Sequence, residues 1–306
     1  ILVTPAIRAL SEKYPDAKID ILAGRRNHSI IENNPRVNGI IVYRKSPPKL
    51  LKTFSELRRY RYDYYIDPKD HESFESSMIA RIVKADIKIG FNPPGKHIFN
   101  TGIRSSLENI DTHFVGRVMQ AVSNTGIKMP QKLPRPELFT KEDSERHTDE
   151  FLKNVDSDFI TINISASRPD RTLSAELLSG IIESSEIDPQ RIVISRAPAE
   201  EGIAKEISEK YGVRVFPSRS MDDVISLIKR SKLLLTPDTS LVHVAAAFDI
   251  PLLALYGRSD VNYKKFSPLS SIQKVIKASG AESGINELPP DKIADKLQEL
   301  MDACGL

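Results

Sequence analysis

Three short segments carry residues whose types and spacing suit the binding of a phosphorylated ligand. The most informative is Asp238-Thr239-Ser240, with His243 three residues further on. The apolar run before Asp238 predicts a buried strand, and residues 239–248 predict a helix that is apolar almost all round. A helix N-terminus presents unpaired backbone N–H groups and a positive potential, so we predict an anion site there with His243 as a further donor. The same residues would also suit an ordinary helix cap beside a core histidine.

The second segment lies between a predicted strand at 159–164 and a helix that starts near Leu173. Its first loop residue, Ser165, is small and permits close approach to the backbone. Arg168 and Arg171 follow, and guanidinium groups pair well with pyrophosphate oxygens. Ligands of α/β proteins bind at the carboxyl ends of strands, which gives a binding role equal weight with a solvated loop and two surface arginines.

The third segment follows the predicted strand 191–195 and contains Glu200 and Glu201. A carboxylate just beyond a strand end can accept hydrogen bonds from ribose hydroxyls. A glutamate also suits the first turn of a helix, where the macrodipole favours it. On these residues alone we prefer the second interpretation.

Other patterns narrow the chemistry. His71, His97 and His113 lack metal-ligand spacing, so we expect no metal. The chain has no P-loop, nucleophile elbow or dinucleotide fingerprint. The net charge of +3, from 44 basic and 41 acidic residues, is too small to predict nucleic-acid binding.

Composition also bears on location. The single cysteine, Cys304, fits a reducing cytoplasm, and no apolar run reaches the roughly 18–20 residues of a membrane span. Residues 58–65 are basic and aromatic. We interpret them as a solvated helix end rather than a membrane-facing surface, since no strong amphipathic basic helix stands out.

The order of the predicted elements indicates two α/β domains. Short β-rich runs alternate with helical patterns along the 306 residues, which predicts parallel sheets with helices on their faces. Residues 130–136 contain three prolines and suit an extended linker. We therefore expect an N-terminal domain at 1–138 and a C-terminal domain at 139–306, with a ligand cleft between them.

Together these segments resemble glycosyltransferase family 9, the ADP-heptose:lipopolysaccharide heptosyltransferases. Members carry a strand–loop–helix motif reading roughly D-T-[GS]-x-x-H-x-A-A-A, which this chain matches at 238–247. Residues 4–10, 62–64 and 197–200 resemble the family as well. The resemblance covers nearly the whole chain, and the aspartate–histidine helix is its most specific element.

The resemblance implies a GT-B fold, in which two Rossmann-like domains face a cleft and the last helix often packs back on the N-terminal domain. The C-terminal domain would bind the nucleotide sugar and the N-terminal domain the acceptor. The residues that we expect to bind the donor are Asp238, Thr239, Ser240, His243, Arg171, Arg168, Ser165, Glu200 and Glu201.

The same resemblance implies a reaction. A hydroxyl of the lipopolysaccharide inner core would attack the anomeric carbon of ADP-heptose and expel ADP with inversion, at the cytoplasmic face of the inner membrane. Arginines and a helix N-terminus directed at the leaving group would make a metal unnecessary. Two alternatives stay open: another nucleotide sugar on the same fold, and a catalytically silent nucleotide-sugar-binding protein.

The chain departs from its family in three places, one of which is Ser165-Ala166 where a glycine-containing turn is usual. Members carry a strand and a Gly-Asp loop just before the helix that corresponds to residues 4–10, and that aspartate is the expected general base. This chain starts at Ile1, directly after that point, so we expect the strand and the base to lie upstream. Arg196 stands where a glycine is common and could narrow the nucleoside pocket.

Overall fold

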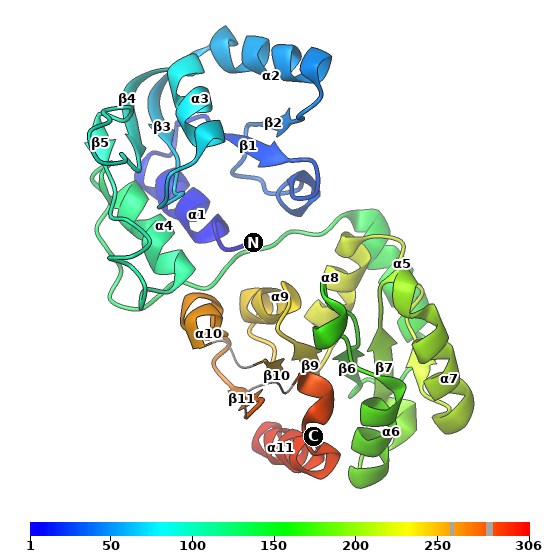
Figure 1. The fold of residues 1–306 in the computed structure, drawn as a ribbon. Coiled ribbons are helices and arrows are strands. Elements are labelled where there is room, and N and C mark those ends of the chain that lie inside the picture. Colours follow the sequence, from blue (N-terminus) through cyan, green and yellow to red (C-terminus); the bar gives the residue numbers. More distant parts are fainter. Residues whose placement is uncertain (258–259, 280–283) are drawn as a thin grey trace. The chain divides into compact units, whose positions relative to one another are not determined.

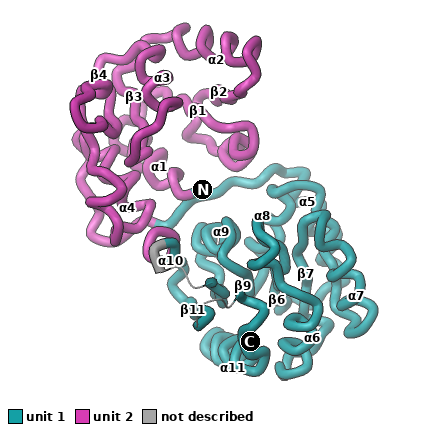
Figure 2. Tube along the Cα trace, viewed as in Figure 1, with its two compact units in different colours: residues 1, 135–263, 268–306 teal, residues 2–134, 264–267 magenta. Residues whose placement is uncertain are grey.

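The computed structural model describes residues 1–257, 260–279 and 284–306, and the chain forms two compact units. The N-terminal unit contains Leu2–Pro134 and Lys264–Ser267 (Figure 2). The C-terminal unit contains Ile1, Arg135–Tyr263 and Pro268–Leu306. The chain leaves the N-terminal unit at Pro134, within the proline-rich stretch that suits a linker.

The C-terminal unit is built on a six-stranded parallel sheet with the order β11-β10-β9-β6-β7-β8 (Figure 1). Every residue of β6, β7, β9 and β10 is buried, which explains why these strands appear in the sequence as continuous apolar runs. The strands are β6 (Ile160–Asn163), β7 (Ile192–Ser195), β8 (Arg214–Val215), β9 (Leu233–Pro237), β10 (Leu252–Tyr256) and β11 (Gln273–Lys277).

Helices connect these strands, and α6, α7 and α11 bury apolar side chains against the sheet. Ser174 caps α6 and Ser220 caps α8, each by accepting a first-turn backbone N–H, as serine does at many helix starts. The last helix, α11, packs against α6, β10 and β11. The helices are α5 (Glu142–Leu152), α6 (Ala175–Ser184), α7 (Glu201–Tyr211), α8 (Met221–Arg230), α9 (Leu241–Phe248) and α11 (Pro290–Cys304). A further helix, α10 (Asp260–Phe266), belongs to the N-terminal unit from Lys264 onward.

The N-terminal unit has two parallel sheets, β1-β2 and β3-β4-β5. The strands are β1 (Asp20–Gly24), β2 (Gly39–Tyr43), β3 (Arg61–Ile66), β4 (Lys84–Gly90) and β5 (Thr101–Gly102). The helices are α1 (Thr4–Lys13), α2 (Pro47–Arg59), α3 (Phe74–Ile82) and α4 (Phe114–Ser123). The sequence pattern at 28–33 predicts a helix, but the segment forms only a single 3-10 turn, His28–Ile30.

A cavity of about 1320 Å³ lies where the two sheets of the N-terminal unit fail to meet. All of β1 and most of β3 line it, together with apolar residues of α1, α3 and α4. Across it, the Tyr62 hydroxyl donates to Asp20 Oδ2 at 3.0 Å. Within the described residues, β1 and β3 each pair with a strand on one side only, so both have an edge free for pairing.

A buried ion pair stabilises the loops of the N-terminal unit. Arg117 Nη1 donates to Asp70 Oδ2 at 2.6 Å, and both side chains are at most 5 % exposed. The other nitrogens of Arg117 donate to the carbonyls of Asn109 and Thr112 at 2.6 and 2.9 Å. One side chain of α4 therefore holds two loop segments that lie far from each other in the sequence.

We expect Arg117→Met to lower the free energy of unfolding by about 3–5 kcal/mol, because it leaves the Asp70 carboxylate buried without a counter-charge. Urea unfolding of both proteins measures this difference. The control is Arg146→Met, at a side chain that is 70 % exposed, where the change should stay within about 0.5 kcal/mol. Equal losses in the two variants would contradict a special role for Arg117.

Candidate active site

The candidate site lies at the carboxyl ends of β6, β7 and β9 in the C-terminal unit. These strands are neighbours, and the order of the strands along the chain reverses between β6 and β9. At the reversal Asn163 Nδ2 donates to Thr236 Oγ1 and to the Ser165 carbonyl, each at 2.9 Å. These bonds hold the loop after β6 beside β9, at the position where open parallel sheets bind nucleotides.

Ser165 and Glu200 form the first polar pair of the site. Ser165 Oγ donates to Glu200 Oε2 at 2.6 Å and accepts the Ala197 N–H at 2.7 Å. Glu201, the first residue of α7, forms an ion pair with Arg196 instead. The structure therefore joins Glu200 to Ser165 and gives Glu201 a different partner.

Arg171 and Asp238 form the second pair, on the β9 side of the site. Arg171 Nη1 donates to Asp238 Oδ2 at 2.8 Å, and the two side chains are 21 % and 16 % exposed. Burial raises the pKa of Asp238, and the positive charge of Arg171 opposes that rise. A guanidinium has five N–H donors, and among the described residues the Arg171 side chain uses one. Its other donors can bind phosphate oxygens.

Arg168 lies outside this pair, although the sequence placed it beside Arg171. Its Nε and Nη2 donate to the two carboxylate oxygens of Asp170, each at 2.9 Å. The Arg168 side chain is 63 % exposed. Arg168 precedes the 3-10 turn Pro169–Arg171, and Arg171 ends it. Arg168 therefore pairs with Asp170, whereas Arg171 pairs with Asp238. Donor binding by Arg168 stays a prediction.

The helix after β9 begins two residues later than the sequence suggests, at Leu241. Thr239 Oγ1 accepts the Leu241 N–H at 3.2 Å, and Ser240 has helical backbone angles without a side-chain cap. The N–H groups of 242–244 bond to the carbonyls of Thr239 and Ser240. The cap therefore comes from Thr239, which leaves the Asp238 carboxylate to its ion pair with an arginine.

Two buried residues with polar rings, His243 and Tyr256, lie on elements that follow or adjoin β9. His243, the third residue of α9, is 8 % exposed. Tyr256 ends β10, next to β9, and its pKa is raised first by burial and then by the charge of Asp238. Tyr256 was not among the site residues expected from the sequence. It could have been found from its position at the carboxyl end of a predicted strand, where ligands of α/β proteins bind.

Arg196, the departure noted in the sequence, directly follows β7. Its guanidinium forms an ion pair with Glu201, and Ser218 Oγ donates to its carbonyl at 3.5 Å. Its Nε is buried and has no hydrogen-bond partner in the part of the chain that the structure describes. An unmet buried donor costs about 1–3 kcal/mol, so an acceptor atom on a ligand would relieve it.

The structure also bears on metals and membranes. Among the described residues, no group of three or more His, Cys, Asp and Glu side chains is arranged to hold a metal ion. No helix in that part of the chain is long and apolar enough to cross a membrane. The expected absence of a metal stays a prediction.

Two parallel α/β units, one with a polar cluster at its strand reversal, define a protein of the parallel α/β class. The model of glycosyltransferase family 9 (heptosyltransferase) matches residues 50–287, and this chain belongs to that family. The resemblance that the sequence motifs indicated is confirmed, and the chain is a glycosyltransferase.

Similar proteins extend over most of the chain. Lipopolysaccharide heptosyltransferase 3 of Escherichia coli is 21 % identical over 282 residues, which cover 85 % of this chain and 80 % of that protein. The family 9 glycosyl transferase of Veillonella parvula DSM 2008 has a TM-score of 0.78 at 16 % identity, covering 99 % and 93 % of the two chains. E. coli heptosyltransferase WaaC with ADP-2-deoxy-2-fluoro heptose has a TM-score of 0.74 at 20 % identity, covering 97 % and 95 %. These likenesses confirm the predicted GT-B fold.

We expect Glu200→Gln to weaken nucleoside diphosphate binding about tenfold or more, because a carboxylate is a much stronger acceptor for ribose hydroxyls than an amide. Glu201→Gln is the matched control, since Glu201 contacts Arg196 instead of Ser165. Calorimetric titration with ADP measures both variants. A larger loss in Glu201→Gln would reverse this assignment.

Proposed function

We propose that this glycosyltransferase transfers heptose from ADP-heptose to an acceptor in the lipopolysaccharide inner core. Its membership of the family described as heptosyltransferase supports this. So do the name of its E. coli relative, lipopolysaccharide heptosyltransferase 3, and the ADP-heptose analogue in the WaaC structure. The observation that carries the proposal is the Arg171–Asp238 pair, which joins the family motif at 238–247 to a basic residue of the neighbouring loop.

In the proposed reaction an acceptor hydroxyl attacks the anomeric carbon of the donor. The bond from that carbon to the diphosphate oxygen breaks with inversion, and negative charge grows on the departing ADP. Arg171 and the positive first turn of α9 stabilise that charge. Asp238 fixes Arg171 before the ligand arrives, so little reorganisation is needed. This source of positive charge supports a metal-independent reaction.

The remaining polar residues orient the donor in this proposal. Glu200 Oε2 accepts from Ser165, and the other carboxylate oxygen of Glu200 accepts from the ribose. Thr239, Ser240 and His243 surround the diphosphate and sugar at the start of α9.

We propose that a further strand of the N-terminal unit, with the loop after it, carries the general base. The cavity of about 1320 Å³ supports this, because a parallel strand between β1 and β3 would join the two sheets and pair both free edges. A loop from that strand into α1 would then lie at the carboxyl edge of the sheet, where ligands bind. Intact mass of the purified protein decides the point: a mass equal to that of these 306 residues contradicts it.

The proposed place of action is the cytoplasmic face of the inner membrane, with peripheral attachment. The lipopolysaccharide acceptor named for the E. coli relative supports this location. No nucleic-acid partner is proposed.

A second candidate function keeps the reaction and changes the donor. Arg196 favours it, because its buried Nε is an unmet hydrogen-bond donor, and the next residue, Ala197, donates its N–H to Ser165 Oγ. A base with a carbonyl in reach, such as uracil or guanine, would satisfy that donor. A measurement of turnover with donor and acceptor distinguishes both of these transferase functions from a catalytically silent nucleotide-sugar-binding protein.

We expect ADP, among ADP, UDP, GDP and CMP, to raise the melting temperature of the wild type most. A ligand at ~100 times its dissociation constant adds about 2.7 kcal/mol of stability. Asp238→Ala should reduce the shift, because Arg171 loses the carboxylate that holds it. Thermal unfolding with each nucleotide measures this.

A larger melting-temperature shift with UDP or GDP would indicate a UDP-sugar or GDP-sugar donor in place of ADP-heptose, on the same glycosyltransferase fold. A shift with a nucleotide, without release of ADP from ADP-heptose in the presence of acceptor, would favour the silent protein. No shift with any nucleotide would contradict a donor site in the C-terminal unit. Running the turnover assay with and without EDTA tests metal independence, and a loss of rate in EDTA would contradict it.

A further inference from the structure

Positive charge is concentrated in one segment of the N-terminal unit. Residues 25–60 contain nine Lys and Arg residues and only two acidic residues, a net charge of +7, whereas the whole chain carries +3. The rest of the chain is therefore net acidic. The overall net charge does not reveal this uneven distribution of charge, which indicates a surface that binds an anionic partner.

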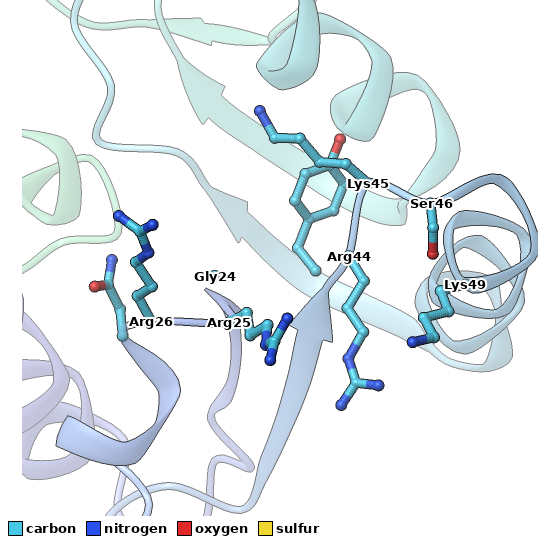
Figure 3. A pocket seen from close by; sticks show the side chains of 9 residues that line it. Gly24, Arg25, Arg26, Arg44, Lys45, Ser46 and Lys49 are labelled. Carbon is cyan, nitrogen blue, oxygen red and sulfur yellow. The ribbon is translucent and has the colours of Figure 1, made fainter. Parts of the chain in front are cut away.

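Much of this charge surrounds a pocket of about 700 Å³ at the carboxyl ends of β1 and β2. Arg25 and Arg26 come from the loop after β1, Arg44 and Lys45 from the loop after β2, and Lys49 from the first turn of α2. Figure 3 shows Arg25, Arg44 and Lys49 pointing into the same space from these three segments.

The pocket has few carboxylates to balance this charge. Lys45 Nζ pairs with Glu75 at 2.6 Å. In the part of the chain that the structure describes, Arg25, Arg26, Arg44 and Lys49 form no ion pair. Cations gathered in one pocket repel one another, so an anion bound among them would be stabilised.

The charge continues beyond the pocket along the exposed side of α2. Lys52 is 78 % exposed, and Arg58 and Arg59 end the helix. Two large apolar side chains accompany these cations: Leu51 is 71 % exposed and Tyr60 53 % exposed. Exposed Lys and Arg beside Leu and Tyr at an amphipathic helix are typical of surfaces that lie on a bilayer. The exposure of these side chains therefore replaces the interpretation of residues 58–65 as only a solvated helix end.

We propose that the pocket and the exposed side of α2, together the basic face, dock the protein on an anionic membrane surface, with lipid headgroup phosphates entering the pocket. The extent of the basic face favours a bilayer over a single soluble ligand, which would occupy only the pocket. This inference gives the proposed membrane location a physical basis, and it does not depend on which sugar is transferred.

The test is co-sedimentation of the whole protein with vesicles, in the absence of nucleotide and acceptor. We compare phosphatidylcholine vesicles with vesicles that contain about one third phosphatidylglycerol. Binding should require the anionic lipid and fall steeply between roughly 0.1 and 0.5 M salt. Because no donor is present, failure here is distinct from failure of the proposed reaction.

Two double variants locate the contact. Arg25→Gln with Arg44→Gln should lower vesicle binding roughly tenfold or more, and Lys52→Gln with Arg59→Gln should lower it as well. The matched control is Arg146→Gln with Lys205→Gln, which removes the same charge from exposed helix positions of the C-terminal unit and should leave binding unchanged. Unaltered thermal unfolding of each variant shows that it is folded.

Equal binding to both kinds of vesicle, or equal losses in all three variants, would overturn the proposal. So would the absence of vesicle binding combined with saturable binding of inorganic pyrophosphate that Arg25→Gln with Arg44→Gln abolishes. That last result would assign the pocket to a soluble anion.

Discussion

The candidate site depends on the ion pair between Arg171 and Asp238. Burial alone would protonate the carboxylate more readily, since it raises the pKa of Asp238, and the guanidinium opposes this. In return the carboxylate fixes a guanidinium whose other donors can meet phosphate oxygens. Each side chain stabilises the other in this position, because a partly buried charge loses stabilisation when its partner is removed.

The sheet determines where this pair can form. A parallel sheet whose strand order reverses between β6 and β9 brings the loops after both strands to one edge. Asn163 then ties these loops together through Thr236, and Thr236 Oγ1 lies 3.3 Å from the Thr239 hydroxyl that caps α9. The buried apolar strands stabilise the sheet. The polar contacts from Asn163 through Thr236 to Thr239 fix the positions of the loops after β6 and β9 relative to each other.

How much could be predicted from the sequence differs from one feature to the next. The buried strands of the C-terminal unit could be predicted, because short continuous apolar runs between predicted helices are typical of buried parallel strands. The pairing of Arg171, rather than Arg168, with Asp238 was not, because it depends on how one 3-10 turn directs two nearby arginines. The choice between Glu200 and Glu201 likewise depends on a turn. The pattern at 28–33 predicted a helix, but only a 3-10 turn forms there, because the asparagines and Pro35 that follow disfavour a longer helix.

The central claim is that Arg171, held by Asp238, binds the donor diphosphate. Calorimetric titration of ADP into wild type, Arg171→Gln and Arg168→Gln tests it most directly. We predict a dissociation constant at least about tenfold higher for Arg171→Gln, because a charge-assisted hydrogen bond is lost, and a value within about twofold of wild type for Arg168→Gln. Unchanged binding in Arg171→Gln, or a larger loss in Arg168→Gln, would contradict it.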